Sequence, residues 1–152
     1  MRTATAFLSI LLVAACATDE PDPVIDDATT AEMTTTETLT VADFAGTWEN
    51  VAMLEGVDEP VPSTMTGSAA GNDWTMSLEG RASIPLNVRV EGDSLIGESE
   101  AYESILRPGV MVTVRTASVL HGDMLMGRLV SIYQTADGEE RVSGTIEGTR
   151  VP

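Results

Sequence analysis

Residues 110–133, VMVTVRTASVLHGDMLMGRLVSIY, contain two alternating runs on either side of a tight turn at Gly122 and Asp123. Alternation around a two-residue glycine turn predicts an antiparallel β-hairpin. The turn fixes the register, and the pairs that share one face are Leu120 with Leu125, Ser118 with Gly127, Thr116 with Leu129, Val114 with Ser131, and Val112 with Tyr133. We expect this face to point into the interior of the protein.

Further strands are predicted before and after this hairpin. The segments with alternating or β-rich character are 46–53, 63–69, 74–78, 84–91 and 141–150. A tight turn at 91–94 adds one more strand and sets opposite one another the pairs Val90 and Leu95, Val88 and Gly97, Leu86 and Ser99, and Ile84 and Ala101.

An internal repeat supports this assignment. Segments 92–97 and 122–127 share the form Gly-Asp-x-Leu-x-Gly, and each opens a strand directly after a turn. The repeat predicts that Leu95, Gly97, Leu125 and Gly127 face one interior. A glycine at this place in a strand indicates a sharp bend, or a large side chain packed against the backbone.

About eight strands in simple succession predict an all-β fold, an antiparallel up-and-down barrel. The links after the second, fourth and sixth strands are tight turns, whereas segments 54–62, 79–83 and 103–109 are longer. Alternate links of a meander lie at opposite ends. We therefore expect one end closed by hairpins and a mouth framed by the longer loops.

Two tripeptides mark the ends of the predicted barrel. Gly46-Thr47-Trp48 opens the first strand and Gly148-Thr149-Arg150 ends the last. If these strands pair, Arg150 can lie over Trp48 and donate to nearby carbonyls. This resembles the lipocalin (calycin) superfamily, in which a Gly-x-Trp in the first strand packs against a basic residue near the end of the last. The resemblance covers residues 41–150 and implies a lipocalin-like barrel closed by Trp48 and Arg150. The alternative is a core tryptophan and an exposed terminal charge.

The N-terminus carries a short basic start at Arg2, an apolar run over 6–15, and then Val13-Ala14-Ala15-Cys16. This resembles the lipobox of bacterial lipoproteins, and Cys16 is the only cysteine in the chain. The resemblance implies a signal peptide of residues 1–15, cleavage before Cys16 and acylation of that residue. The alternative is an ordinary secretory signal, with Cys16 incidental.

Three regions follow from this reading. Residues 1–15 are the signal peptide, residues 16–40 an acidic, Thr-rich disordered tether without aromatic residues, and residues 41–152 the barrel domain. Because Ala17 rather than an aspartate follows the cysteine, the resemblance implies anchoring in the bacterial outer membrane, facing the periplasm. The partner at this end is membrane lipid, reached through acylated Cys16.

Composition excludes several classes of function. The formal net charge of −16 disfavours nucleic acid and anionic surfaces as partners. His121 is the only histidine and falls in a predicted turn, so residue pairs for nucleophilic catalysis and sets of transition-metal ligands are lacking. We expect no metal, no cofactor and no enzymatic activity. Catalysis in a shaped pocket is a third possibility, in which Glu98, Glu100 and Tyr133 would be buried together.

The leading functional hypothesis is a barrel that binds a small, mainly apolar ligand in its lumen. The residues predicted to line that lumen are Trp74, Met76, Leu86, Val88, Ser99, Leu129, Ser131 and Tyr133. The alternative is a protein-interaction or structural module of the envelope, acting as a homodimer or with another envelope protein. This alternative rests on an apolar outer face formed by Met111, Ala117, Met126, Val130 and Ile132.

Overall fold

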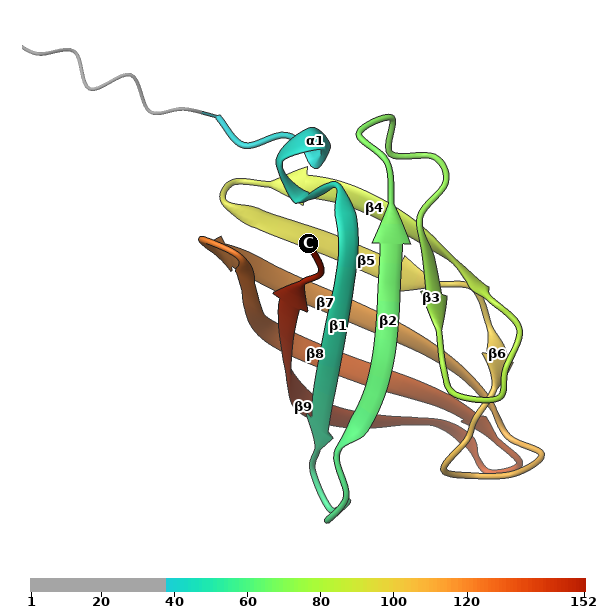
Figure 1. The fold of residues 1–152 in the computed structure, drawn as a ribbon. Coiled ribbons are helices and arrows are strands. Elements are labelled where there is room, and N and C mark those ends of the chain that lie inside the picture. Colours follow the sequence, from blue (N-terminus) through green and yellow to red (C-terminus); the bar gives the residue numbers. More distant parts are fainter. Residues whose placement is uncertain (1–37) are drawn as a thin grey trace, which may run out of the picture. The chain divides into compact units, whose positions relative to one another are not determined.

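The computed structural model describes residues 38–152, which form one antiparallel sheet closed into a barrel and preceded by a short helix (Figure 1). The predicted signal peptide, Cys16 and all but the last three residues of the predicted tether lie outside the described residues. The elements are α1 (Val41–Phe44), β1 (Gly46–Leu54), β2 (Val61–Gly67), β3 (Thr75–Ser77), β4 (Ile84–Glu91), β5 (Ser94–Ser99), β6 (Tyr102–Glu103), β7 (Met111–His121), β8 (Met124–Thr135) and β9 (Gly138–Arg150).

Two pairings between non-neighbouring strands close the sheet. β1 pairs with β9, and β5 pairs with β7. The two-residue β6 continues the position of β5, because it pairs with the other end of β7. The barrel therefore has eight strand positions, which confirms the predicted fold class. The short β6 was not predicted from sequence.

The register of the β7–β8 hairpin is confirmed from Leu120 opposite Leu125 to Val112 opposite Tyr133. The pairing of β4 with β5 is confirmed as far as Leu86 opposite Ser99. The predicted pair of Ile84 with Ala101 is wrong, because the pairing of β4 with β5 ends at Ser99 and only the Glu100 nitrogen, which donates to the Pro85 carbonyl over 3.0 Å, extends it.

The predicted third strand, 74–78, is longer than the observed β3, Thr75–Ser77. Trp74 directly precedes β3, its carbonyl accepts from the Leu86 nitrogen of β4 over 2.8 Å, and its indole nitrogen donates to the Ser68 carbonyl over 3.0 Å. Its ring lies against Gly67, where a Cβ atom would overlap it. Glycine at position 67 therefore makes room for the indole of Trp74.

Three large aromatic side chains fill one end of the barrel. Phe44, Trp48 and Trp74 are completely or almost completely buried and pack with Leu95 and Leu125. In Figure 1 the helix α1 lies at this end, next to the start of β1 and the C-terminus. The tight β4–β5 and β7–β8 turns lie at the same end, so it is closed as predicted.

The loops that follow β1, β3, β6 and β8, at 55–60, 78–83, 104–110 and 136–137, lie at the opposite end. We call this end the mouth and residues 104–110 the mouth loop. Among residues 38–152, no helix is long and apolar enough to cross a membrane.

Candidate functional site

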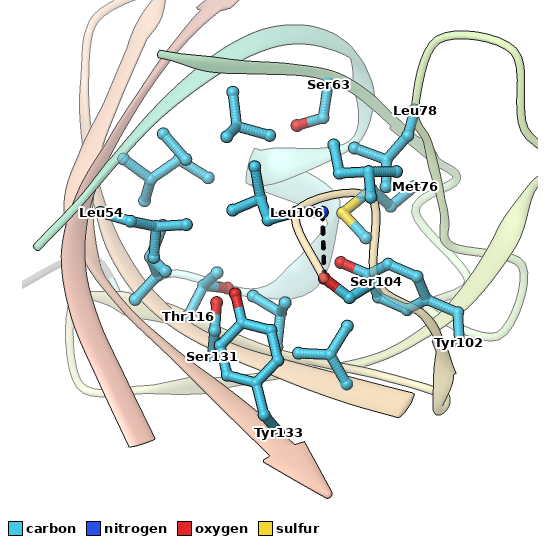
Figure 2. A pocket seen from close by; sticks show the side chains of 17 residues that line it. Leu54, Ser63, Met76, Leu78, Tyr102, Ser104, Leu106, Thr116, Ser131 and Tyr133 are labelled. Atoms are coloured by element: carbon cyan, nitrogen blue, oxygen red, sulfur yellow. Dashed lines mark hydrogen bonds between the residues drawn. The ribbon is translucent and has the colours of Figure 1, made fainter. Parts of the chain in front are cut away.

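The candidate site is a cavity inside the barrel, beneath the mouth loop (Figure 2). It has a volume of about 70 Å³. The side chains around it are those of Ala52, Leu54, Val61, Ser63, Met76, Leu78, Tyr102, Ser104, Ile105, Leu106, Val112, Val114, Thr116, Leu129, Ser131, Tyr133 and Ile146.

A second cavity of about 40 Å³ lies nearer the closed end, between Leu95 and Leu125. Both cavities are bordered by Met76, Val114 and Thr116, so the two form successive chambers of one lumen. A water molecule needs roughly 10–15 Å³ of such volume. The outer chamber therefore has room for roughly five water molecules, or for a compact molecule of similar size.

Strand alternation determines which side chains reach this lumen. On β7, Val112, Val114 and Thr116 point inward, and their partners on β8 are Tyr133, Ser131 and Leu129. Successive side chains of a strand point to opposite faces, so one register choice places all of them on the inner wall.

The mouth loop is held in place by its own hydrogen bonds. The hydroxyl of Ser104, a side chain that is 2% exposed, accepts from the backbone nitrogens of Leu106 and Arg107, each over 3.1 Å. The Gly109 nitrogen donates to a Glu103 carboxylate oxygen over 2.9 Å. These contacts form a compact turn, and Figure 2 shows Leu106 over the pocket. The Leu106 side chain is a partial cover, because it stays 38% exposed.

Arg107 connects the mouth loop to two strands. Its terminal nitrogens donate to the two carboxylate oxygens of Glu140 on β9 over 2.7 and 2.8 Å. Its guanidinium carbon lies 4.2 Å from the centre of the Tyr133 ring on β8. The hydrogen bonds from Arg107 lower the pKa of Glu140, and those to Glu140 raise the pKa of Arg107. On the other side of the mouth, Arg81 donates to the Glu103 carbonyl over 3.1 Å.

The lumen is uncharged. Among residues 38–152, no Asp, Glu, His or Arg side chain lines either chamber. The polar groups of the outer chamber are hydroxyls, those of Ser63, Tyr102, Ser104, Thr116, Ser131 and Tyr133. Burial, and to a lesser extent the neighbouring Tyr133, raises the pKa of Tyr102 to about 12. The lumen therefore presents neutral hydrogen-bonding groups at ordinary pH.

The structure brings together five of the eight residues predicted for the lumen. The outer chamber contains Met76, Leu129, Ser131 and Tyr133, and the inner chamber contains Met76 and Leu86. The other three residues do not line either chamber. Trp74 packs into the closed end, and Val88 packs against the same aromatic cluster. The buried hydroxyl of Ser99 accepts from the Val114 nitrogen over 2.9 Å, at the point where β5 separates from β7.

Trp48 and Arg150 lie directly opposite one another in the β1–β9 register, as the predicted closing pair requires. The Arg150 guanidinium carbon lies 4.2 Å from the centre of the Trp48 ring. Arg150 also donates to the carbonyls of Asp43, over 2.9 Å, and Ala45. The Trp48 indole nitrogen donates to the Phe44 carbonyl over 2.8 Å. The Trp48–Arg150 pair thus connects α1 to the β1–β9 pairing that closes the barrel.

Sequence reasoning missed the lumen residues of the mouth loop and of β6, chiefly Tyr102, Ser104 and Leu106. No strand alternation runs through this segment, so no pattern signalled that it folds back over the lumen. The inward positions of β1, Ala52 and Leu54, could have been found, because they continue the alternation that includes Trp48.

The outer wall carries several exposed apolar side chains. Val51 and Met53 of β1 are each 45% exposed, and Met124 and Met126 of β8 are 43% and 44% exposed. Met126 thus points outward, as predicted. Ile132 also faces outward but is only 5% exposed, so it contributes little to this surface. Glu147 of β9 lies between Val51 and Met126 in the register and interrupts the apolar area.

No group of three or more His, Cys, Asp or Glu side chains within residues 38–152 is arranged to hold a metal ion. Glu98 faces out of the barrel and pairs with Arg115 over 3.1 Å, away from Tyr133. Comparisons of the sequence with protein-family models and curated proteins, and of the structure with solved structures, found no match.

Proposed function

We propose that this chain is a bacterial envelope lipoprotein with a lipocalin-like barrel that binds a small, mainly apolar ligand in its lumen. The observation that carries the proposal is the outer chamber, an uncharged cavity of about 70 Å³ at the mouth end. Cavities that hold small ligands are typically lined by apolar side chains with a few polar groups. The role is binding rather than catalysis.

The mouth loop supports this proposal. It covers the lumen with Leu106 and Ile105, whose side chains remain 38% and 39% exposed. The loop is joined to the wall by side-chain contacts of Arg107 rather than by strand pairing with β8 or β9. Such contacts open at lower cost than a sheet, so a ligand can enter by displacement of this loop.

Methionine methyl groups give a direct test, because they lie on both sides of the wall. Met65 and Met76 face the lumen, whereas Met53 and Met126 are exposed on the outside. The full chain, labelled at methionine methyls and held in lipid nanodiscs, is titrated with benzene or indole. We expect saturable shifts of Met76, with Met53 and Met126 unchanged. Unsaturable shifts of all methionines alike would contradict lumenal binding.

A cavity-filling variant sharpens this test. Val114 borders both chambers, so Val114→Phe should block binding at a cost in stability of about 1–3 kcal/mol. Val119→Phe is the matched control, since Val119 lies on the outward face of the same strand, opposite Met126. Equal loss of binding in both variants would show that the effect is not lumenal.

The lipid anchor is tested separately, by the intact mass of the protein extracted from bacterial envelopes. Acylation predicts a mature chain that begins at Cys16 and carries the added mass of acyl groups. Cys16→Ser should abolish both the added mass and membrane association. A mature chain with an unmodified Cys16 would support the ordinary secretory alternative. Separation of the inner and outer membranes then tests the proposed location.

The exposed methionines of the outer wall favour a second candidate function, self-association through β1 and β8. In the same labelled sample, this would shift Met53 and Met126 with increasing protein concentration and leave Met76 unchanged. A monomer by light scattering, with constant methionine signals, would exclude it.

A further inference from the structure

Three hydroxyls lie on one wall of the outer chamber. Ser131 and Tyr133 are two residues apart on β8, so they share its inward face. Thr116 of β7 lies opposite Leu129, which places it diagonally across from Ser131. Diagonal neighbours on one face of a sheet lie close enough for their side chains to contact the same ligand. In Figure 2 the oxygens of these three side chains lie together at the pocket, on the opposite side from Met76 and Leu78.

These hydroxyls are not used by the fold. Ser131 is 3% exposed and Tyr133 2% exposed, yet within residues 38–152 neither hydroxyl hydrogen-bonds to another protein group. In that range, every side-chain oxygen that is fully shielded from solvent has a hydrogen-bond partner. The Ser131 and Tyr133 oxygens have no partner, so they are not fully shielded and must face the open cavity. Ser104 and Ser99 differ, because their hydroxyls accept from backbone nitrogens. The Ser131 and Tyr133 hydroxyls are therefore free to bind an occupant, and the Thr116 hydroxyl, which lies next to Gly97, is on the same wall.

The charges around the lumen exclude an ionised occupant. No charged side chain within residues 38–152 lines either chamber. The guanidinium nearest to Tyr133, that of Arg107, lies against the ring and donates to Glu140. Transfer of an ion from water into an apolar cavity without an opposite charge is strongly unfavourable.

We infer that the lumenal ligand is a compact, uncharged molecule with a hydrogen-bonding oxygen, such as an alcohol or a ketone. Thr116, Ser131 and Tyr133 hold that oxygen, and Leu54, Leu129 and Ile146 surround the apolar part. This inference rests on the proposed function and adds the chemical class of ligand.

Three ring compounds of similar shape test the inference: cyclohexanol, methylcyclohexane and cyclohexanecarboxylate. Each is titrated into the full chain in lipid nanodiscs, with the Met76 methyl signal as the readout and the free aqueous concentration as the reference. We expect cyclohexanol and methylcyclohexane to bind and the carboxylate not to bind. Thr116→Val and Ser131→Ala should each weaken cyclohexanol by about 2- to 10-fold. Neither variant should weaken methylcyclohexane by more than about 2-fold.

Ser143→Ala is the matched control, because Ser143 is exposed on the outer face of β9, lines neither chamber and should leave cyclohexanol binding unchanged. Equal effects of Thr116→Val and Ser131→Ala on cyclohexanol and methylcyclohexane would overturn the inference and leave lumenal binding intact. Tight binding of the carboxylate, lost in Arg107→Gln, would also overturn it. No binding by any of the three compounds would overturn the proposed function and the inference together.

Discussion

The Arg107 guanidinium lies over the Tyr133 ring, with its central carbon 4.2 Å from the ring centre. At the same time it donates to both carboxylate oxygens of Glu140. One side chain therefore holds the mouth loop to β8 and to β9. Tyr133 also lines the outer chamber, so the loop contact and the cavity wall share a residue.

Arg107→Gln should increase opening of the mouth loop while leaving the barrel folded. The Arg107 and Glu140 side chains are 35% and 51% exposed, so solvent screens their attraction and the loss of global stability should be small. Hydrogen exchange at the Leu106 and Arg107 amides, which donate to Ser104, should become faster. Arg141→Gln is the control, because Arg141 pairs with Glu139 outside the loop. Unchanged exchange in Arg107→Gln would show that the loop is held by its internal hydrogen bonds alone.

The Arg107–Glu140 contact should weaken in acid. The hydrogen bonds from Arg107 hold the pKa of Glu140 below its ordinary value of 4.5. The pKa of Glu140 is lower in the folded protein than in the unfolded chain. The contact therefore stabilises the fold fully above the unfolded pKa, and this stabilisation is lost as the pH falls through the folded pKa. Carboxyl carbon chemical shifts should place the Glu140 midpoint below 4.5, and Arg107→Gln should raise it. A Glu140 midpoint that is the same in both proteins would contradict the contact.

Tyr102 should titrate late in alkali. Its pKa is raised to about 12, mainly by burial and then by the neighbouring Tyr133. The folded pKa of Tyr102 exceeds its unfolded pKa of about 10. The stability that the buried, neutral Tyr102 contributes is therefore complete below pH 10. It is lost as the pH rises through about 12. Tyrosinate absorbance should show a late component that Tyr102→Phe removes and Tyr133→Phe retains. A single component near pH 10 would mean that Tyr102 is exposed.

The closing pair should show measurable coupling. In a double-mutant cycle of Trp48→Phe and Arg150→Ala, we expect a coupling free energy of about 0.5–2 kcal/mol, from denaturant unfolding. The physical reason is the guanidinium stacked on the buried indole. Arg128→Ala controls for the loss of an exposed arginine on the outer wall. If the two changes in unfolding free energy are strictly additive, Trp48 and Arg150 do not interact, and Trp48 is only a core residue.

Gly67→Ala should destabilise the closed end, because a Cβ atom at this position overlaps the Trp74 ring. We expect a loss of about 1–3 kcal/mol, measured as a lower denaturant midpoint. Trp74→Leu in the same chain should remove the overlap, so the double variant should be more stable than the sum of the single changes predicts. Gly97→Ala is a milder control, since its Cβ would meet only the Thr116 hydroxyl, at 2.8 Å. Additive losses for Gly67 and Trp74 would argue against the contact.

Strand alternation accounts for the parts of this structure that could be predicted. The β7–β8 register, the inward positions of Leu129 and Ser131, and the outward position of Met126 all follow from a period of two around one glycine turn. The Trp48–Arg150 contact could be predicted as well, because successive strands that close into a barrel bring the first beside the last.

The lumen itself depended on contacts between segments distant in the sequence. Trp74 belongs to an alternating segment, but the absence of a side chain at Gly67 lets its ring turn into the closed end. Ser99 is at an inward position in the strand alternation, as predicted, but its hydroxyl accepts a hydrogen bond from the Val114 nitrogen.

The amino-acid pattern was thus enough for the strands, their faces and the closure of the barrel, because alternation and turn geometry are local properties. Only the folded chain could show that the mouth loop covers the lumen and that Arg107 reaches both Tyr133 and Glu140. Nor could the pattern separate free hydroxyls from those used by the backbone. These features depend on packing between residues far apart in the chain, for which a single sequence carries no periodic signal.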